Sequence, residues 1–220
     1  KKNNWTVIKT IGRILVFVLF WANAFSQNYL QFIENKGQWD KQIRFKGEMS
    51  TGAFALQSTG YRVLLHNRDD LNQITQSLHS HATTDTKVQI TSSEKVIKPA
   101  LEGNIGEKLS LHSHAYEMRF LNANPDPVII PDKPLATYSN YFIGNDSSKW
   151  AGNCKTFQAL TYKNVYPGID VHYYTSNSVL KYDFIINPGG DVNNIAMYFD
   201  GAESLKLRDG ALHIKTSVDE

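Results

Sequence analysis

The sequence predicts an all-β fold, an antiparallel β-sandwich that carries a long polar insertion. Two observations support this prediction. Short runs of β-branched and aromatic residues recur along the chain, and turn residues such as Gly, Pro, Asn and Asp separate them. Helical periodicity is scarce outside one stretch, so helices are not expected to form the framework.

The first elements are strands. Residues 43–46 alternate apolar and basic side chains, which is typical of a strand with one face in water. Residues 53–56 and 61–65 flank Ser58-Thr59-Gly60, and two β-type runs around a short turn with Gly predict a hairpin.

Residues 67–106 differ in character, because Thr, Ser, Asn, Asp and Lys dominate there and aromatics are few. A short helix is expected near residues 70–78, where Leu71, Ile74 and Leu78 have helical spacing. The rest is interpreted as a flexible surface insertion, dispensable for folding, since such a composition buries little apolar surface.

Strict alternation resumes at residues 116–120, and residues 122–134 hold four of the seven prolines and are expected to form an extended connector. Further strands are then predicted at residues 138–142, 157–162, 170–174, 180–186, 195–199, 205–207 and 212–215. Pro167-Gly168 predicts a type II turn. Leu180, Tyr182 and Phe184 share one face of their strand and are expected to face the core.

Residues 1–26 have the pattern of a secretory signal peptide. Lys1, Lys2, Lys9 and Arg13 precede an apolar run over residues 14–22, and Ala24 and Ser26 occupy the small-residue positions before cleavage. The run is shorter than the roughly 20 residues that span a bilayer, although an uncleaved membrane anchor is the alternative. We therefore expect cleavage before Gln27, a mature domain over residues 27–220, and a secreted or cell-surface protein.

Charge and cysteine content narrow the classes of function. The chain has 23 basic and 21 acidic residues, and residues 1–26 hold four of the basic ones, so the mature part carries a net charge of −2. This balance argues against nucleic-acid binding. The single Cys154 cannot form an internal disulfide, so the core is expected to hold the exported domain together.

Several phrases have a familiar order: residues 32–39 (FIENKGQW), 141–146 (YFIGND), 162–170 (YKNVYPGID), 180–184 (LKYDF) and 188–191 (PGGD). Together they resemble an uncharacterised N-terminal domain of large secreted Bacteroidetes-type proteins. The resemblance implies that propeller-like or PKD-like repeats follow the domain. It also implies a gliding-motility-type C-terminal sorting domain read by the type IX secretion system.

The predicted strand at residues 212–215 ends close to Glu220, and the chain has no initiator Met. With the resemblance, this leads us to expect a domain truncated at its C-terminus. The partners would then be downstream domains of the same polypeptide, together with the secretion machinery during export.

Metal sites are the first chemical alternative. His79 with His81, and His112 with His114, are His-x-His pairs whose side chains would share a face on a strand, as zinc requires, but no third ligand is evident. Asp191, Asn193 and Asn194 follow Gly190, yet the EF-hand spacing fails, so turn chemistry explains them better. No metal site and no cofactor is therefore assigned.

Catalytic groups are the second alternative. Asp170 and Asp183 fall on neighbouring predicted strands, as a pair of glycosidase carboxylates would, but each also has a routine structural role. Cys154 beside Lys155 lacks any motif of a nucleophile and is expected to be a structural thiol. We assign no catalytic residue and expect no enzyme.

Aromatic residues are the third alternative. An exposed platform would favour sugar stacking, whereas the core is their ordinary place. Its candidate members are Trp39, Trp150, Tyr138, Tyr141, Tyr173 and Tyr174. The function predicted from the sequence is therefore a non-catalytic structural or adhesive module of a multidomain exported protein. The alternatives are a carbohydrate-binding module, with surface glycans as partners, and a metal-dependent hydrolase that would use His112 and His114.

Overall fold

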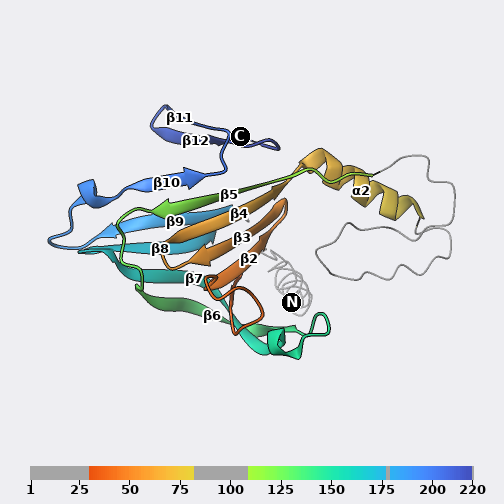
Figure 1. Cartoon of the computed structure of the whole chain (residues 1–220), viewed down its shortest axis with the longest axis horizontal. Coiled ribbons are helices and arrows are strands. Elements are labelled where there is room, and N and C mark those ends of the chain that lie inside the picture. Colours follow the sequence, from red (N-terminus) through yellow and green to blue (C-terminus); the bar gives the residue numbers. More distant parts are fainter. Residues whose placement is uncertain (1–29, 82–108, 177–178, 220) are drawn as a thin grey trace, which may run out of the picture.

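The computed structural model describes residues 30–81, 109–176 and 179–219 (Figure 1). The predicted signal peptide over residues 1–26, and residues 82–106 of the predicted insertion, lie outside the described residues. In the described part of the chain, no helix is long and apolar enough to cross a membrane.

Strands dominate the described structure, and every pair of neighbouring strands is antiparallel, which confirms the predicted all-β fold. The strands are β1 (Phe32–Glu34), β2 (Phe45–Met49), β3 (Gly52–Gln57), β4 (Gly60–His66), β5 (Ser113–Phe120), β6 (Val128–Tyr141), β7 (Ala151–Tyr166), β8 (Ile169–Ser176), β9 (Val179–Ile186), β10 (Met197–Asp200), β11 (Ser204–Arg208) and β12 (Ala211–Lys215). Two 3₁₀ turns accompany them, η1 (Ser147–Lys149) and η2 (Val192–Asn194).

One large sheet contains the strands from β1 to β10. Its order is β10-β5-β4-β3-β2-β1-β7-β8-β9, and β6 also pairs with β7. The hairpin predicted around Ser58-Thr59-Gly60 is confirmed as β3 and β4, with Gln57 opposite Gly60. The 3₁₀ turns and the loops lie outside this sheet, while β11 and β12 form a separate two-stranded sheet beyond β10 (Figure 1).

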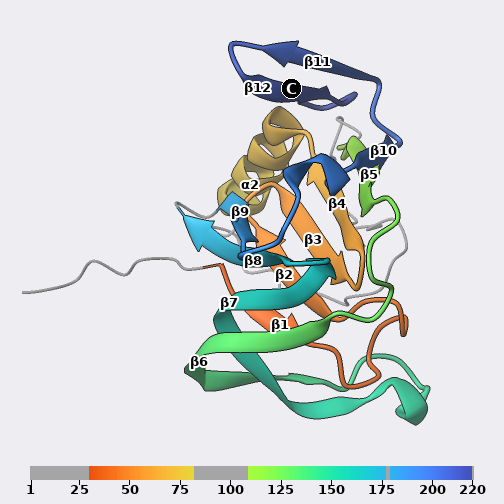
Figure 2. The same cartoon turned by 90° about the vertical axis from the view of Figure 1, so that its left-hand side faces the viewer.

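The large sheet curls so that strands far apart in its order face each other across one core (Figure 2). Tyr61 of β4 lies 5.8 Å from Tyr182 of β9, and Phe120 of β5 lies 5.5 Å from Phe184 of β9, between ring centroids. The core therefore sits between two halves of one sheet, where a sandwich would place it between two separate sheets. Tyr182 and Phe184 face this core together with Leu180, as the alternation predicted.

The proline-rich connector predicted over residues 122–134 is wrong in its second half, because β6 begins at Val128 and contains Pro131 and Pro134. Proline lacks the N–H that a central strand must donate, but β6 pairs only with β7 among the described strands, so its other edge needs no donor. The β6–β7 register also shifts between Pro134 and Tyr138, which marks a bulge or irregularity.

The helix expected near residues 70–78 is present and longer, as α2 (Arg68–His81). Asn67 caps it, since its side-chain oxygen accepts hydrogen bonds from the backbone N–H of Asp69 and Asp70, at 3.0 and 3.1 Å. The Asp70 carboxylate in turn accepts the backbone N–H of His112 and contacts its Nδ1, both at 2.7 Å. The first turn of α2 is thus tied to the segment that enters β5.

Candidate functional site

The catalytic and metal candidates raised by the sequence do not converge. His112 contacts Asp70, whereas His114 contacts Ser217 and Gly201, so the pair serves two separate places. The side chains of His79 and His81 lie outside the described residues. Among the described side chains, no group of three His, Cys, Asp or Glu residues is placed to hold a metal ion.

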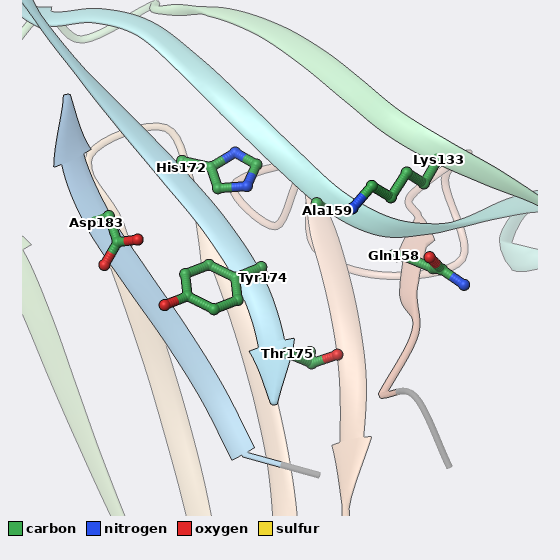
Figure 3. A pocket seen from close by; sticks show the side chains of 7 residues that line it. All are labelled: Lys133, Gln158, Ala159, His172, Tyr174, Thr175 and Asp183. Atoms are coloured by element: carbon green, nitrogen blue, oxygen red, sulfur yellow. The ribbon is translucent and has the colours of Figure 1, made fainter. Parts of the chain in front are cut away.

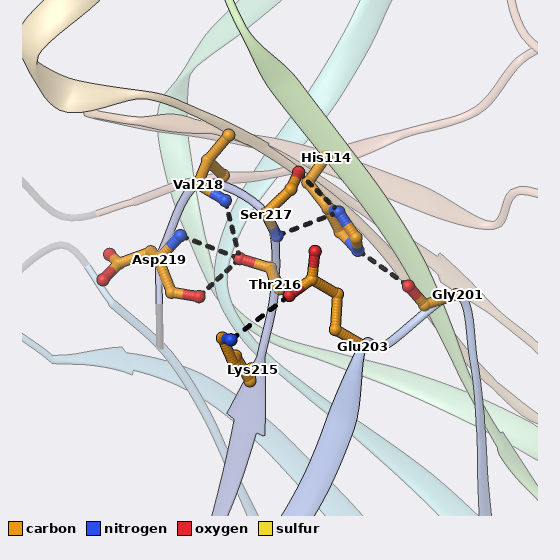
Figure 4. Close-up of polar contacts among 8 residues, drawn as sticks. All are labelled: His114, Gly201, Glu203, Lys215, Thr216, Ser217, Val218 and Asp219. Carbon is orange, nitrogen blue, oxygen red and sulfur yellow. Dashed lines mark hydrogen bonds and ion pairs between the residues drawn. The ribbon is translucent and has the colours of Figure 1, made fainter.

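His114 fastens the small sheet to the large one. Its Nε2 lies 2.7 Å from the carbonyl oxygen of Gly201, and its Nδ1 lies 2.9 Å from the Ser217 hydroxyl (Figure 4). The backbone N–H of Ser217 also donates to Nδ1, at 3.2 Å, so Nδ1 is the acceptor and Nε2 the donor. Beside this contact, Lys215 and Glu203 form an ion pair of 3.6 Å. His114 therefore has a structural role where β11 and β12 meet β5.

Asp170, one of the two carboxylates considered for catalysis, is committed to a buried network. Its side chain is 1% exposed and accepts hydrogen bonds from Lys163 Nζ, from the backbone N–H of Asn164 at 2.8 Å and from Asn187 Nδ2 at 3.1 Å. Burial acts to raise the pKa of Asp170, but the bonds from Lys163, Asn164 and Asn187 outweigh it and lower the pKa below its ordinary value. Asp170 thus holds the turn between β7 and β8 in its ionised form.

Cys154 and Asp191, two further candidates for chemistry, also contribute to the structure of the fold. Cys154 is buried, and its thiol points to the Ala151 carbonyl oxygen at 3.8 Å. Burial raises the pKa of this thiol, which disfavours the reactive thiolate. Asp191 caps η2 by accepting hydrogen bonds from the backbone and side-chain nitrogens of Asn193, at 2.9 and 2.8 Å, as turn chemistry predicts.

The aromatic platform considered as an alternative in the sequence analysis is not assembled as one surface. Tyr173 is fully buried in the core, and Trp39 packs edge-to-face on Tyr141 with 5.0 Å between ring centroids. The separation of Tyr173 from Tyr174 follows from strand alternation, because successive side chains of β8 point to opposite faces. Tyr138 of β6 is 60% exposed, and Tyr174 and Trp150 also remain near the surface, at two different places that are described next.

The first place is a loop between β6 and β7 that keeps large apolar side chains in water. Phe142, Ile143 and Trp150, which we call the loop patch, are 62%, 51% and 46% exposed. Single exposed apolar side chains are ordinary on a soluble protein, but apolar side chains gathered in one exposed patch often mark a contact site. The loop patch is therefore a candidate contact surface.

Hydrogen bonds hold this loop in shape. Asp146 caps η1 by accepting from the backbone N–H of Ser148 at 3.1 Å, and Trp150 Nε1 donates to the Gly144 carbonyl oxygen at 3.2 Å. The rings of Phe142 and Trp150 pack edge-to-face with 6.0 Å between centroids. The loop's own contacts thus fix the exposed rings, and a surface that is already fixed would lose little entropy on binding.

The second place is a shallow hollow of about 260 Å³ on the outer face of the sheet, which we call the outer hollow (Figure 3). It is lined by Lys133, Gln158, Ala159, His172, Tyr174, Thr175 and Asp183. The rings of His172 and Tyr174 are nearly parallel, at 22°, with centroids 5.6 Å apart. Partial burial and the Asp183 carboxylate with its hydrogen bond raise the pKa of Tyr174, which keeps the hydroxyl protonated.

The sequence analysis missed His172, Gln158 and Lys133. Period-two spacing could have found His172, because it lies two residues before Tyr174 and so on the same face of β8. Gln158 and Lys133 had no local signal, since the pairing of β6 with β7 and of β7 with β8 brings them there.

The first of the sequence phrases that carry the resemblance, residues 32–39, contributes side chains that hold the fold together. Asn35, in the phrase over residues 32–39, donates through Nδ2 to the carbonyl oxygens of Asp40 and Ile43, at 2.9 and 2.8 Å, and so closes the loop before β2. Lys36 donates to the Gly152 carbonyl oxygen at 3.0 Å and joins this loop to β7. These contacts give Asn35 and Lys36 structural roles in the fold.

Comparison with known proteins finds a family for this chain but no described relative. No curated protein and no solved structure matches the chain. A family model described as a domain of unknown function, DUF7948, matches residues 32–220 and therefore covers nearly all of the described structure. The chain belongs to this DUF7948 family of domains.

Proposed function

We propose that this chain is a non-catalytic adhesive module of an exported protein and that it makes its contact through the loop patch. The observation that carries the proposal is the exposure of Phe142, Ile143 and Trp150 on a loop whose shape is fixed by its own hydrogen bonds. Aromatic side chains on a rigid support are the residues that contribute most to protein contacts, because they bury much area for little lost entropy.

The settings of the other candidate residues support a non-catalytic role. Asp170 is saturated by three donors, Cys154 is buried, and His112 and His114 each bind a structural partner. A group that is already fully bonded within the fold is poorly placed to exchange protons with a substrate.

The sequence supports the remaining parts of the proposal. The signal-peptide pattern over residues 1–26 supports export to the surface or the medium. The resemblance to N-terminal domains of large secreted Bacteroidetes-type proteins supports a multidomain context with downstream domains and type IX sorting. In that context the module would stand at the front of the protein, with its loop patch available to a neighbouring surface.

Bead retention under flow tests this proposal. Beads are coated with residues 27–220 and passed over cells of the producing organism and over glass. Phe142→Ser with Trp150→Ser should reduce retention to that of uncoated beads, since the double variant removes both rings of the loop patch. The matched control is Leu207→Ser with Leu212→Ser, which removes two exposed apolar side chains (76% and 41% exposed) from the small sheet. Equal retention of the wild type and the patch variant would contradict the proposal.

A further inference from the structure

We propose that the outer hollow binds one pyranose unit of an uncharged polysaccharide, with the rings of Tyr174 and His172 beneath the sugar and Asp183 and Gln158 bonded to its hydroxyls. The outer hollow and the loop patch share no residues, so the sugar proposed here is a separate ligand from the partner of the loop patch.

The two rings form a prepared platform. Both belong to β8, which pairs with β7 on one side and β9 on the other, so the backbone beneath them is fixed. His172 Nδ1 lies 3.0 Å from the Thr161 hydroxyl, and Figure 3 shows the Tyr174 hydroxyl directed toward Asp183 on β9. Two nearly parallel rings, 22° apart in orientation, present apolar area to the C–H groups of a sugar face, which pack on the electron-rich face of an aromatic ring.

Polar groups from three other strands line the hollow beside the platform. Lys133 comes from β6, Gln158 from β7 and Asp183 from β9, whereas the Thr175 hydroxyl donates within the fold to the Leu30 carbonyl oxygen at 3.2 Å. The first three offer a cation, an amide and a carboxylate, which together both donate and accept hydrogen bonds. Sugar hydroxyls also donate and accept, and binding sites commonly combine an apolar surface with a few such polar groups.

The size and the charges of the outer hollow limit the class of ligand that it can bind. The hollow measures about 260 Å³. Pockets for drug-sized molecules begin at about 300 Å³, so the hollow suits a single ring. Lys133 is the one cation among the seven lining residues, and the carboxylate of Asp183 opposes an anion. A phosphate or a uronic acid is therefore a poorer match than a neutral pyranose.

Titration of residues 27–220 with cellohexaose, laminarihexaose and mannohexaose tests the inference, with hexagalacturonate as the charged comparison. At least one neutral hexasaccharide should bind in the millimolar range or tighter. It should shift the amide NMR signals of His172, Tyr174 and Asp183 while leaving that of Tyr198 unchanged.

Variants then locate the site. Tyr174→Ala should weaken binding about tenfold, because the stacking ring is lost. Tyr198→Ala removes an exposed tyrosine (45% exposed) from β10, away from the outer hollow, and should leave the affinity unchanged. The Phe142→Ser/Trp150→Ser variant should bind the sugar like the wild type, so failure of the adhesive function and failure of this site are distinguishable.

Three results would overturn the inference: no neutral hexasaccharide shifts these signals, hexagalacturonate binds best, or Tyr174→Ala binds as tightly as the wild type. The NMR titration uses the wild-type protein, so it decides the matter even where a variant fails to fold.

Discussion

Lys163, near the end of β7, donates to the buried carboxylate of Asp170 at the start of β8, so one ion pair spans the turn that joins these two strands. The turn itself runs through Pro167 and Gly168, as predicted, and Gly168 has φ +72°. Because the side chain of Asp170 is 1% exposed, its bonds are protected from water.

Asp170→Asn should destabilise the fold by about 2–3 kcal/mol, since the amide cannot accept from all three donors and leaves Lys163 without its partner charge. Denaturant unfolding measures this loss. Asp183→Asn is the matched control, because Asp183 lies on the exposed outer face, and it should change the free energy of unfolding by less than about 0.5 kcal/mol. An equal effect of the two substitutions would contradict the structural role of Asp170.

The same carboxylate predicts a pH dependence. The pKa of Asp170 is lowered in the folded state, so its contribution is fully present above the unfolded pKa of about 3.9 and is lost as the pH falls through the folded value. The stability difference between the wild type and Asp170→Asn should be constant above about pH 5 and shrink below about pH 4. A difference that stays the same from pH 6 to pH 3 would show that another group holds the turn.

Gly168 and Gly210 both have positive φ, so replacing each by alanine distinguishes the cost of backbone strain from the cost of a steric clash. A Cβ on Gly168 would lie 2.8 Å from backbone atoms of Gly190, whereas a Cβ on Gly210, at φ +77°, would meet nothing within 4 Å. Gly210→Ala should therefore cost only the backbone strain of about 1 kcal/mol, and Gly168→Ala should cost at least about 1 kcal/mol more. Thermal unfolding of both variants provides the comparison, and equal costs would mean that the Gly168–Gly190 approach is not tight.

The segment between β4 and β5 should be replaceable. His66 pairs with Ser113, and the Asn67 N–H donates to the His112 carbonyl oxygen at 2.8 Å, so the two strand ends already lie side by side. Replacing residues 68–111 by a short Asn-Gly turn should leave the free energy of unfolding within about 1 kcal/mol, because a shorter loop costs less entropy to close.

Chemical denaturation measures this effect, with Asp70→Asn in the full chain to isolate the contact between Asp70 and His112. A replacement variant that is unfolded would show that residues 68–111 belong to the framework of the domain and are no insertion.

Local pattern predicted much of the fold. The β3–β4 hairpin, the alternation of Leu180, Tyr182 and Phe184, and the Pro167-Gly168 turn are each decided by neighbouring residues, and each is confirmed. The strands predicted at residues 205–207 and 212–215 are confirmed in β11 and β12, which pair around Asp209 and Gly210; both residues have positive φ, as a tight hairpin turn requires.

Contacts between residues far apart in the sequence could not be predicted from the pattern of neighbouring residues. Proline content hid the first part of β6, because a sequence does not say that Pro131 lies on a strand that pairs on one edge only among the described strands. The curl that brings Tyr61 against Tyr182 depends on the twist of many strands together. The outer hollow depends on the same curl and pairing, so Tyr174 was a candidate whereas Lys133 and Gln158 were not.

The central claim is that the loop patch is the surface that touches the partner. Oxidative footprinting of residues 27–220 measures this directly, first free in solution and then attached to the cell surface on which the coated beads are retained. The account predicts that Phe142 and Trp150 become several-fold less oxidised on attachment, while Leu207 on the small sheet is oxidised equally in both states. Unchanged oxidation of Trp150, with protection of Leu207 in its place, would contradict the account and assign the contact to β11 and β12.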